Sequence, residues 1–289
     1  MAPPEVILMG TFTGAIYGLI GIGLSLIFTG IRNMINLAHG HLAVLAAYLA
    51  LTLSSNSMLD PLICALLVVP IVFALGAIIQ YGAVNRLIYR SPTIPLILFA
   101  GIASIIENVA LLVWHPDPRS LAPLAPYSLL TVSLLGVRLP LIYLVGFLIS
   151  LGSMLILYTF LKHTDIGRAI RAASEDPEYA ECLGVDTKKI YAYTFGIGGA
   201  LAAIAGIMVG LIYLFVPSDG WPYTILSFGV IVLGGVGSMR GAFVGGVILG
   251  ISQQLSAYYL GVAYQYFVGY ILILAVLALR PQGIFGMRV

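Results

Sequence analysis

The sequence predicts an all-α, polytopic membrane protein that forms a single transmembrane domain over residues 1–289. Three observations lead to this fold class. The chain is 61% hydrophobic with a mean hydropathy of +1.07, and only 8% of its residues are charged, whereas soluble domains have about 25% charged residues. Its apolar residues form continuous runs of about twenty residues, which is the length of a membrane helix. A β-barrel would instead require strict alternation of apolar and polar residues.

Nine apolar segments follow one another along the chain, and most are long enough to cross a bilayer at a helical rise of about 1.5 Å per residue. They cover residues 6–29, 37–54, 61–82, 94–114, 140–161, 191–215, 223–237, 241–259 and 262–279. The segment 223–237 is short for a crossing, so we expect a half-helix or a tilted span there. We therefore predict about eight to nine membrane segments, some of them short or discontinuous.

The basic residues predict the orientation. When residues 162–190 are placed in the cytoplasm, ten Lys and Arg side chains fall on the cytoplasmic side, and Arg119 and Arg138 fall outside. This distribution follows the positive-inside rule. We predict a multi-pass protein of the cell inner (plasma) membrane, with the N-terminus external and the C-terminus cytoplasmic. The N-terminus lacks a basic stretch and a clear cleavage site, so the first segment is expected to remain in the protein.

Residues 162–190 form the most charged part of the chain. The stretch holds five of the thirteen basic and six of the eleven acidic residues. Each charge would cost roughly 2.5 to 3.5 kcal/mol inside hydrocarbon. We therefore expect this stretch to be a cytoplasmic loop between two membrane spans.

A short helix is predicted within this loop, over residues 177–183. Asp176 can cap the free N–H groups of its first turn, and Pro177 suits the first helical position. Gly184 suits a left-handed residue just past the last turn. Its packing face is expected to consist of Tyr179, Cys182 and Leu183. Asp186 or Thr187 is expected to cap the next helix.

Two interpretations of this helix are open on pattern alone. An ordinary charged loop marking the cytoplasmic side is the more common case, because short capped helices occur in many loops. The alternative is a docking helix offered to a cytoplasmic protein.

The stretch GRAIRAASEDPEYAECLGVDTKK (167–189) resembles the coupling loop of ABC importer permeases of the branched-chain amino acid type. In that family an E-x-A-x-x-x-G core fits a groove on the ATPase subunit, and Glu178, Ala180 and Gly184 stand at those positions. The resemblance continues in NMINLAHGHLAVLAAY (33–48), VLGGVGSMRGAFVGGVILG (232–250) and RPQGIFG (280–286). Four motifs in family order make the resemblance specific, and it covers nearly the whole chain.

The resemblance implies an ABC importer permease fold of the type II-like kind and the import of branched-chain or other small hydrophobic amino acids. It also implies the partners: a second permease subunit, unlike or identical, two cytoplasmic ATPase subunits and an external substrate-binding protein. ATP with Mg²⁺ would be bound by the ATPase, and no cofactor by this chain. The residues that the resemblance assigns to ATPase coupling are Glu175, Asp176, Pro177, Glu178, Tyr179, Ala180, Cys182, Leu183 and Gly184.

A break at residues 30–41 is the first candidate for the translocation path. The interrupted helix would expose backbone N–H and C=O groups, which transporters use to bind small solutes. A hydrated cytoplasmic turn explains the same residues equally well. The family has an N-x-A-H-G-like turn here, which favours the functional interpretation, although His41 stands where the family often has a carboxylate. The candidates are Asn36, His39, Gly40 and His41.

Two further places contribute candidates for the path. The glycine-rich turn at 234–241 resembles the first break and hints at an internal repeat; its candidates are Gly234, Gly235, Ser238 and Arg240. Glu107 and Asn108 lie in the middle of the fourth apolar segment. A carboxylate at that depth must be neutral, paired or beside water, so either a path residue or a buried hydrogen-bond network explains it.

The sequence contains no motif for chemistry of its own. It has no G-x-x-x-x-G-K-[ST] phosphate loop and no G-x-S-x-G nucleophile turn. No metal site is predicted, because His39 and His41 are two residues apart and face different sides of a helix. A net charge of +2 gives no indication of nucleic-acid binding, and Cys64 and Cys182 do not suggest a disulfide. We therefore expect no enzyme activity, and the alternative function is a stand-alone channel or secondary transporter for a small neutral solute such as urea or a short amide.

Overall fold

The computed structural model describes residues 4–31, 34–88, 93–134, 136–280 and 282–286. Most of this chain is helical, and one short antiparallel hairpin interrupts it. The helices are α1 (Pro4–Gly30), α2 (His39–Ser57), α3 (Pro61–Gly82), α4 (Thr93–Trp114), α5 (Leu141–His163), α6 (Asp165–Glu175), α7 (Pro177–Cys182), α8 (Thr187–Ile212), α9 (Gly220–Gly234), α10 (Met239–Tyr259) and α11 (Gln265–Leu279). The hairpin pairs β1 (Thr131–Leu134) with β2 (Val137–Pro140).

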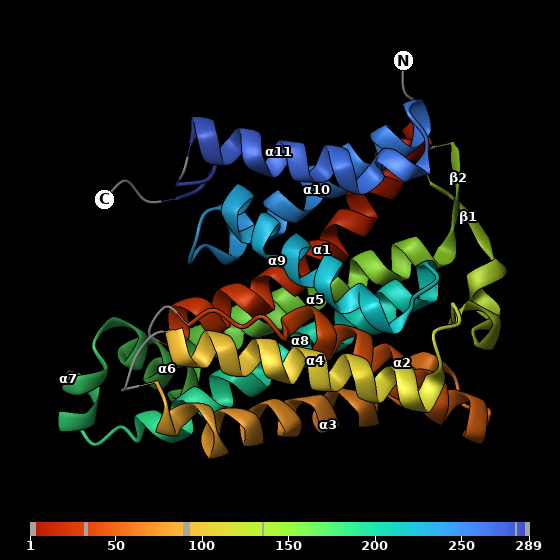
Figure 1. Ribbon diagram of the computed structural model, residues 1–289. Helices are drawn as coiled ribbons and strands as arrows, with labels where there is room; N and C mark the ends of the chain where they lie inside the picture. Colours follow the sequence, from red (N-terminus) through yellow and green to blue (C-terminus); the bar gives the residue numbers. More distant parts are fainter. Residues whose placement is uncertain (1–3, 32–33, 89–92, 135, 281, 287–289) are drawn as a thin grey trace.

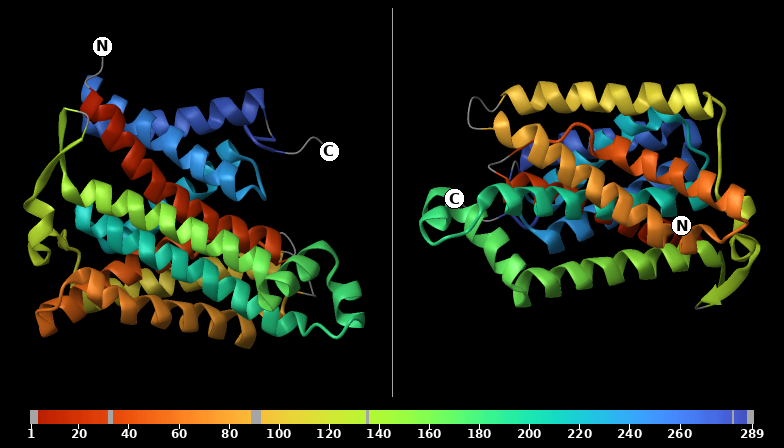
Figure 2. Two further views of the ribbon diagram at one scale, coloured as in Figure 1. Left: turned by 180° about the vertical axis from the view of Figure 1, so that it is seen from behind. Right: turned by 90° about the horizontal axis from the view of Figure 1, so that it is seen from below.

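The long helices lie roughly alongside one another and give the body two distinct ends (Figure 1). The α7 end carries α6 and α7 and is the end at which the C-terminus lies. The hairpin end carries β1, β2 and the N-terminus. Figure 2 shows that α4 and α5 cover opposite sides of the body, with the other helices between them. The two termini therefore lie at opposite ends, as the predicted orientation requires, although which end faces the cytoplasm stays a prediction.

Two helices form the centre of the bundle. In their most apolar windows, 89% of the residues of α1 and 78% of those of α8 are buried, against 6% to 22% for α3, α4, α5 and α11. Close backbone contact holds α1 against α10, since a Cβ added at Gly246 would lie 2.4 Å from the Gly18 nitrogen. Small residues permit this approach where lipid supplies no hydrophobic drive between helices.

The predicted number of membrane segments is not confirmed. Within the described residues, six helices are long and apolar enough to cross a membrane, and the bent pair α9–α10 raises the number to seven at most. The predicted half-helix at 223–237 is present as the 15-residue α9, which meets α10 at a bend of 115°. The other predicted segment that is not among the six spans is α2, because its Gly, Ala, Ser and His residues make it less apolar than they are.

Candidate functional site

The helix α2 begins inside the body rather than at its surface. Before it, residues 34–38 are non-helical, and Met34, Asn36 and Ala38 are buried. The Nε2 atom of His39 lies 3.0 Å from the carbonyl oxygen of Ile20. Since Ile20 is ten residues before the end of α1, this contact is about 15 Å from that end at 1.5 Å per residue. The predicted interrupted helix is therefore present, and its free end is deep within the bundle.

The start of α9 packs against the start of α2. The Gly40 N–H donates to the Thr224 hydroxyl oxygen at 3.0 Å. The same hydroxyl donates in turn to the Gly220 carbonyl oxygen at 2.9 Å. A Cβ at Gly40 would lie 2.2 Å from the Gly220 oxygen, so only glycine permits this approach. From this point α2 runs toward the hairpin end and α9 toward the α7 end (Figure 1). Two helix N-termini, each with a partial positive charge, therefore meet inside the body.

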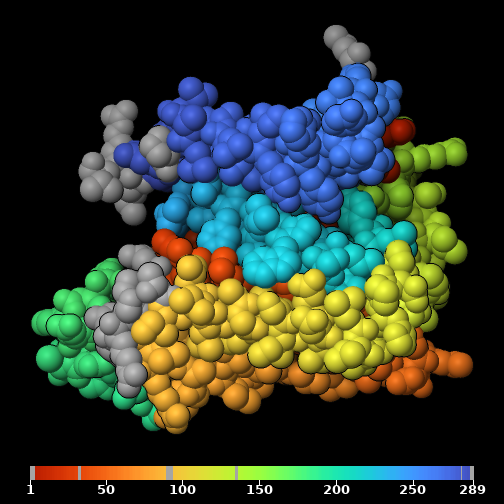
Figure 3. All heavy atoms as spheres, in the orientation of Figure 1, coloured from red at the N-terminus to blue at the C-terminus, as the bar shows by residue number. Residues whose placement is uncertain are grey.

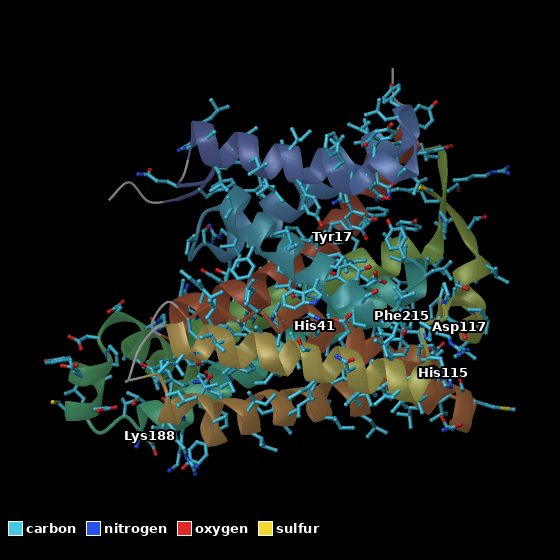
Figure 4. All side chains as sticks on the ribbon, in the orientation of Figure 1. Tyr17, His41, His115, Asp117, Lys188 and Phe215 are labelled. Carbon is cyan, nitrogen blue, oxygen red and sulfur yellow. The ribbon has the colours of Figure 1, made fainter. Side chains whose placement is uncertain are left out.

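A carboxylate from α4 reaches the same place. The Trp221 indole N–H donates to Glu107 Oε2 at 3.1 Å, and the His41 Nε2 atom lies 3.5 Å from the same oxygen. The rings of His41 and Trp221 are in edge-to-face contact, with centroids 4.9 Å apart. His41 is 1% exposed and Glu107 is 20% exposed, so the carboxylate is the accessible member of the pair. Figure 4 shows His41 in the middle of the body, where α9 and α4 are neighbours.

We call this assembly the polar core. It comprises seven residues from three helices and the segment before α2: Asn36, His39, Gly40, His41, Glu107, Trp221 and Thr224. Within the described part of the chain, four of its buried nitrogen atoms have no hydrogen-bond partner: Asn36 Nδ2, His39 Nδ1 and both ring nitrogens of His41. Buried polar groups are almost always paired with protein or water. The polar core can therefore offer hydrogen bonds to a small polar solute.

The predicted short helix is confirmed at the α7 end. It spans Pro177–Cys182, and Asp176 Oδ1 accepts a hydrogen bond from the Tyr179 N–H at 3.0 Å. Gly184 has a φ of +87°, the left-handed conformation that its sequence position predicts. Of the two proposed caps for α8, Asp186 is the one present, because its Oδ1 accepts from the Lys189 N–H at 3.2 Å.

The predicted packing face of α7 was wrong. Tyr179 is 65% exposed and Leu183 is 68% exposed, and Cys182 is also exposed, whereas Ala180 is buried. The chain turns tightly behind α7, where the Val185 N–H donates to the Ala180 carbonyl oxygen at 3.0 Å, so a small side chain faces inward. Tyr179, Cys182 and Leu183 therefore point away from the body, and we call them the docking face.

Residues 6–277 match the protein family described as "Branched-chain amino acid transport system / permease component". The chain belongs to this family. It is a multi-pass membrane permease component and not an enzyme, as predicted.

Several relatives of this permease match nearly its whole length. It is 33% identical to the high-affinity branched-chain amino acid transport system permease protein LivH of Salmonella typhimurium, covering 96% of this chain and 93% of the relative. It is 34% identical to the corresponding protein BraD of Pseudomonas aeruginosa, with 96% and 94% covered. Among solved structures, PsaBC from Streptococcus pneumoniae in complex with Fab matches with a TM-score of 0.55, 13% identity and coverage of 98% and 93%. This similarity supports the fold and nothing further.

The permease does not bring all the predicted path residues together. Asn108 is exposed on α4 and donates to the carbonyl oxygen of Ser104 in its own helix at 2.8 Å. The second break lies at the α7 end, where Gly235 has a φ of +98° and Ser238 accepts from the Gly241 N–H at 3.0 Å as the cap of α10. The candidates of this break, Gly234, Gly235, Ser238 and Arg240, are therefore not part of the polar core.

Residues 282–286, from the motif RPQGIFG near the C-terminus, hold the second break at 234–241 in place. The N–H groups of Ile284 and Phe285 donate to the carbonyl oxygens of Leu233 and Gly234 at 2.9 and 3.0 Å. These carbonyls belong to the last turn of α9, which has no following helical turn to satisfy them. Residues 282–286 therefore cap α9, so this break is closed by the chain itself, whereas the polar core keeps unpaired groups.

Sequence reasoning missed two members of the polar core, Trp221 and Thr224. Thr224 lies at the start of the predicted segment 223–237 and Trp221 just before it, and both lie in the first turns of α9, where an indole and a hydroxyl are common as helix contacts. One signal was present: Trp221 stands between Gly220 and Pro222 at the start of a segment too short to cross alone. Such a half-helix start is a place where transporters bind solutes.

Proposed function

We propose that this chain is one of two membrane subunits of an ATP-driven importer for branched-chain or other small hydrophobic amino acids. Family membership supports the substrate class, and so do the LivH and BraD relatives, which are permease proteins of branched-chain amino acid transport systems. The observation that carries the proposal is the docking face, which presents two large apolar side chains on a capped helix outside the spans. The family assignment does not favour the alternative of a stand-alone channel.

In this proposal the docking face enters a groove on a cytoplasmic ATPase subunit. Large exposed side chains such as Tyr179 and Leu183 are typical anchors of protein interfaces, since burying each one removes apolar surface from water. ATP and Mg²⁺ are bound and ATP is hydrolysed by the two ATPase subunits, and this chain binds no cofactor. The α7 end is then cytoplasmic, and the hairpin end faces the external substrate-binding protein.

The attachment of α7 suits it to transmit motion. The helix α6 that precedes it lies directly on the end of α5, because a Cβ at Gly167 would lie 2.6 Å from the Leu161 Cα atom. Thr164 caps α6 by accepting from the Gly167 N–H at 3.0 Å, and Arg171 donates to the Leu161 carbonyl oxygen. A displacement of α7 therefore moves the end of α5, which precedes it through α6. It also moves the capped start of α8, which follows α7 in the chain.

The polar core supplies the contacts that a zwitterionic solute needs. Glu107 can hold an ammonium group, while the converging starts of α2 and α9 favour a carboxylate. An aliphatic side chain gains about 0.8 kcal/mol per buried CH₂ on apolar walls. In this proposal the amino acid passes the polar core as the two access states alternate, and the second permease subunit completes the path.

Purification of the tagged chain from its native membrane tests the ATPase docking. The wild-type chain is expected to carry ATPase activity through purification, and the Tyr179→Asp/Leu183→Asp variant to lose about tenfold or more of it, because two charges replace the apolar anchors. Leu129→Asp is the matched control, since Leu129 is 88% exposed at the hairpin end. Full ATPase recovery with the double variant would refute the docking role, and amino acid uptake without ATP would favour the channel.

A further inference from the structure

A cavity of about 630 Å³ lies at the α7 end, outside the polar core and the docking face. It is an open cavity lined by the ends of α1 and α5, by α6 and by the α9–α10 turn. Figure 2 shows α1, α5 and α6 side by side at this end, and a Cβ added at Gly237 would lie 3.4 Å from the Thr29 side chain. Its polar lining consists of Ser25, Thr29, Lys162, Arg171, Ser174 and Glu175, together with the Tyr158 ring.

Two cations from distant parts of the sequence approach the Tyr158 ring, which lines this cavity; Lys162 also lines the cavity, and Arg240 lies beside it. The Lys162 Nζ atom lies 5.9 Å from the centroid of the Tyr158 ring, and the guanidinium carbon of Arg240 lies 5.7 Å from it. Within the described ranges, neither cation forms a salt bridge. Like charges gathered in this way repel one another, and a ring quadrupole offsets this only in part. The arrangement therefore favours an anion between or beside them.

The remaining charges of the cavity leave it basic. Arg171 adds a third positive charge, and it donates to the Leu161 carbonyl oxygen. Glu175 contributes the one carboxylate among the lining residues. Ser174 and Thr29 contribute hydroxyl groups, which can donate to an oxyanion. This donor set of ammonium, guanidinium and hydroxyl groups suits the oxygen atoms of a phosphate.

The position of the cavity indicates where the phosphate comes from. Lys162 follows the last buried residue of the membrane helix α5, and α6 turns away from it. In α6, Ile170 and Ala173 are buried while Arg168 and Arg171 are exposed. The exposed face also carries Asp165 and Glu175, so α6 has one apolar and one charged face, and such an amphipathic helix suits the membrane interface, at the depth of lipid headgroups. Basic pockets between membrane helices on this side are suited to acidic lipids.

We propose that this basic cavity binds a phosphate group, supplied at this depth by the headgroup of an anionic phospholipid. The lipid phosphate contacts Lys162 at the end of α5 and Arg240 at the start of α10, and it ties the segment that carries the docking helix to the α9–α10 break. Anionic lipid thereby stiffens the connection between the ATPase-contacting end and the bent helix pair. Neutral lipid lacks the net charge that the cations require.

Native mass spectrometry of the purified full chain tests this site, with phosphatidylglycerol, phosphatidylcholine and glycerol 3-phosphate as probes. The wild-type chain is expected to retain phosphatidylglycerol at least about tenfold more tightly than phosphatidylcholine. Lys162→Gln/Arg240→Gln is expected to lose about tenfold in phosphatidylglycerol affinity, and Lys162→Arg/Arg240→Lys to keep it. Arg138→Gln/Lys188→Gln is the matched control, since it removes two exposed charges elsewhere.

Each outcome decides the proposal. Equal loss of lipid with the control variant would show a general charge effect and would overturn the site. Binding of glycerol 3-phosphate as tight as that of phosphatidylglycerol would assign the cavity to a soluble phosphate and overturn the lipid source. The double variant Lys162→Gln/Arg240→Gln could prove unstable in thermal denaturation. In that case phosphatidylglycerol retention is compared between Lys162→Arg/Arg240→Lys and the single variant Arg240→Gln. Equal retention by these two proteins would refute the site.

Discussion

The helix α7, which carries the proposed docking face, and the polar core are built in opposite ways; α7 is called the docking helix below. The docking helix α7 is made by neighbours in sequence: Asp176 begins it, Gly184 ends it, and its large side chains are exposed. The polar core is made by residues as far apart as His41, Glu107 and Thr224, and most of its residues are buried. A locally determined element can be presented to a partner without disturbing the bundle. An element held by long-range contacts changes only when the helices that form it change their packing.

This difference predicts different responses to substitution. Exposed side chains on the docking helix can be replaced with little effect on folding, since surface changes usually stay within about 0.5 kcal/mol. Substitutions in the polar core act on packing and on buried hydrogen bonds, where effects of several kcal/mol are found. We therefore expect substitutions in α7 to change function without changing stability, and substitutions in the polar core to change both.

The largest effect is expected from Gly40→Ala. The added methyl group would lie 2.2 Å from the Gly220 carbonyl oxygen and 2.4 Å from the Thr224 nitrogen, and neither backbone atom can move alone. Overpacking of this kind costs about 1 to 3 kcal/mol or more. We expect a lower midpoint of thermal unfolding in detergent and loss of amino acid uptake.

Gly152→Ala is the matched control for this substitution. No atom lies within 4 Å of a Cβ built at Gly152 in α5, and alanine is the better helix former by about 0.5 to 1 kcal/mol. This variant should unfold at the same or a slightly higher temperature. If Gly40→Ala were as stable and as active as Gly152→Ala, the close meeting of α2 and α9 would not exist.

A smaller and more selective effect is expected from Glu107→Gln. Glutamine keeps an oxygen that can accept from the Trp221 indole, so the fold is retained, but the negative charge beside His41 is lost. Hydrogen bonds to charged groups contribute about 1.5 to 3 kcal/mol, so uptake of radiolabelled leucine should fall about 10- to 100-fold at limiting substrate. Ser104→Ala on the same helix should leave uptake unchanged. Unchanged uptake with Glu107→Gln would remove the carboxylate from the path.

The same contrast explains what the sequence could predict. The helix start at Asp176, its end at Gly184 and the cap at Asp186 depend on residues within a few positions, so they were predictable. The inward direction of Ala180 depends on how tightly the chain turns between α6 and α8, and the packing face predicted from Tyr179 and Leu183 was therefore wrong.

The polar core was predictable only in part. Polar residues in apolar segments gave Asn36, His39 and Glu107, because an ionisable or amide group in hydrocarbon requires an explanation. Their meeting with Trp221 and Thr224 depends on the depth at which α2 and α9 begin, and local patterns do not give that depth. The predicted number of spans is not confirmed for a related reason, since α2 and α9 begin inside the body and α9 then meets α10 at a sharp bend at the α7 end.

The smallest effect is expected at Asp186, which caps α8 beside the docking helix. A hydrogen bond from the Lys189 side chain lowers the pKa of the Asp186 carboxyl below its usual value. Because this pKa is lowered on folding, the stabilisation is present above the unfolded value of about 3.9 and is lost as the pH falls through the folded value.

Asp186→Asn keeps the capping oxygen and removes the charge, so hydrogen exchange at the Lys189 amide should rise only about twofold at pH 7, as for an exposed ion pair. At pH 3, after correction for intrinsic exchange, wild type and variant should differ less. The Gly40 amide, which donates to Thr224 inside the bundle, should show no difference between the two proteins at either pH. A matching change in exchange at the Gly40 amide would mean that the start of α8 and the polar core open together. The two regions would then form one cooperative unit.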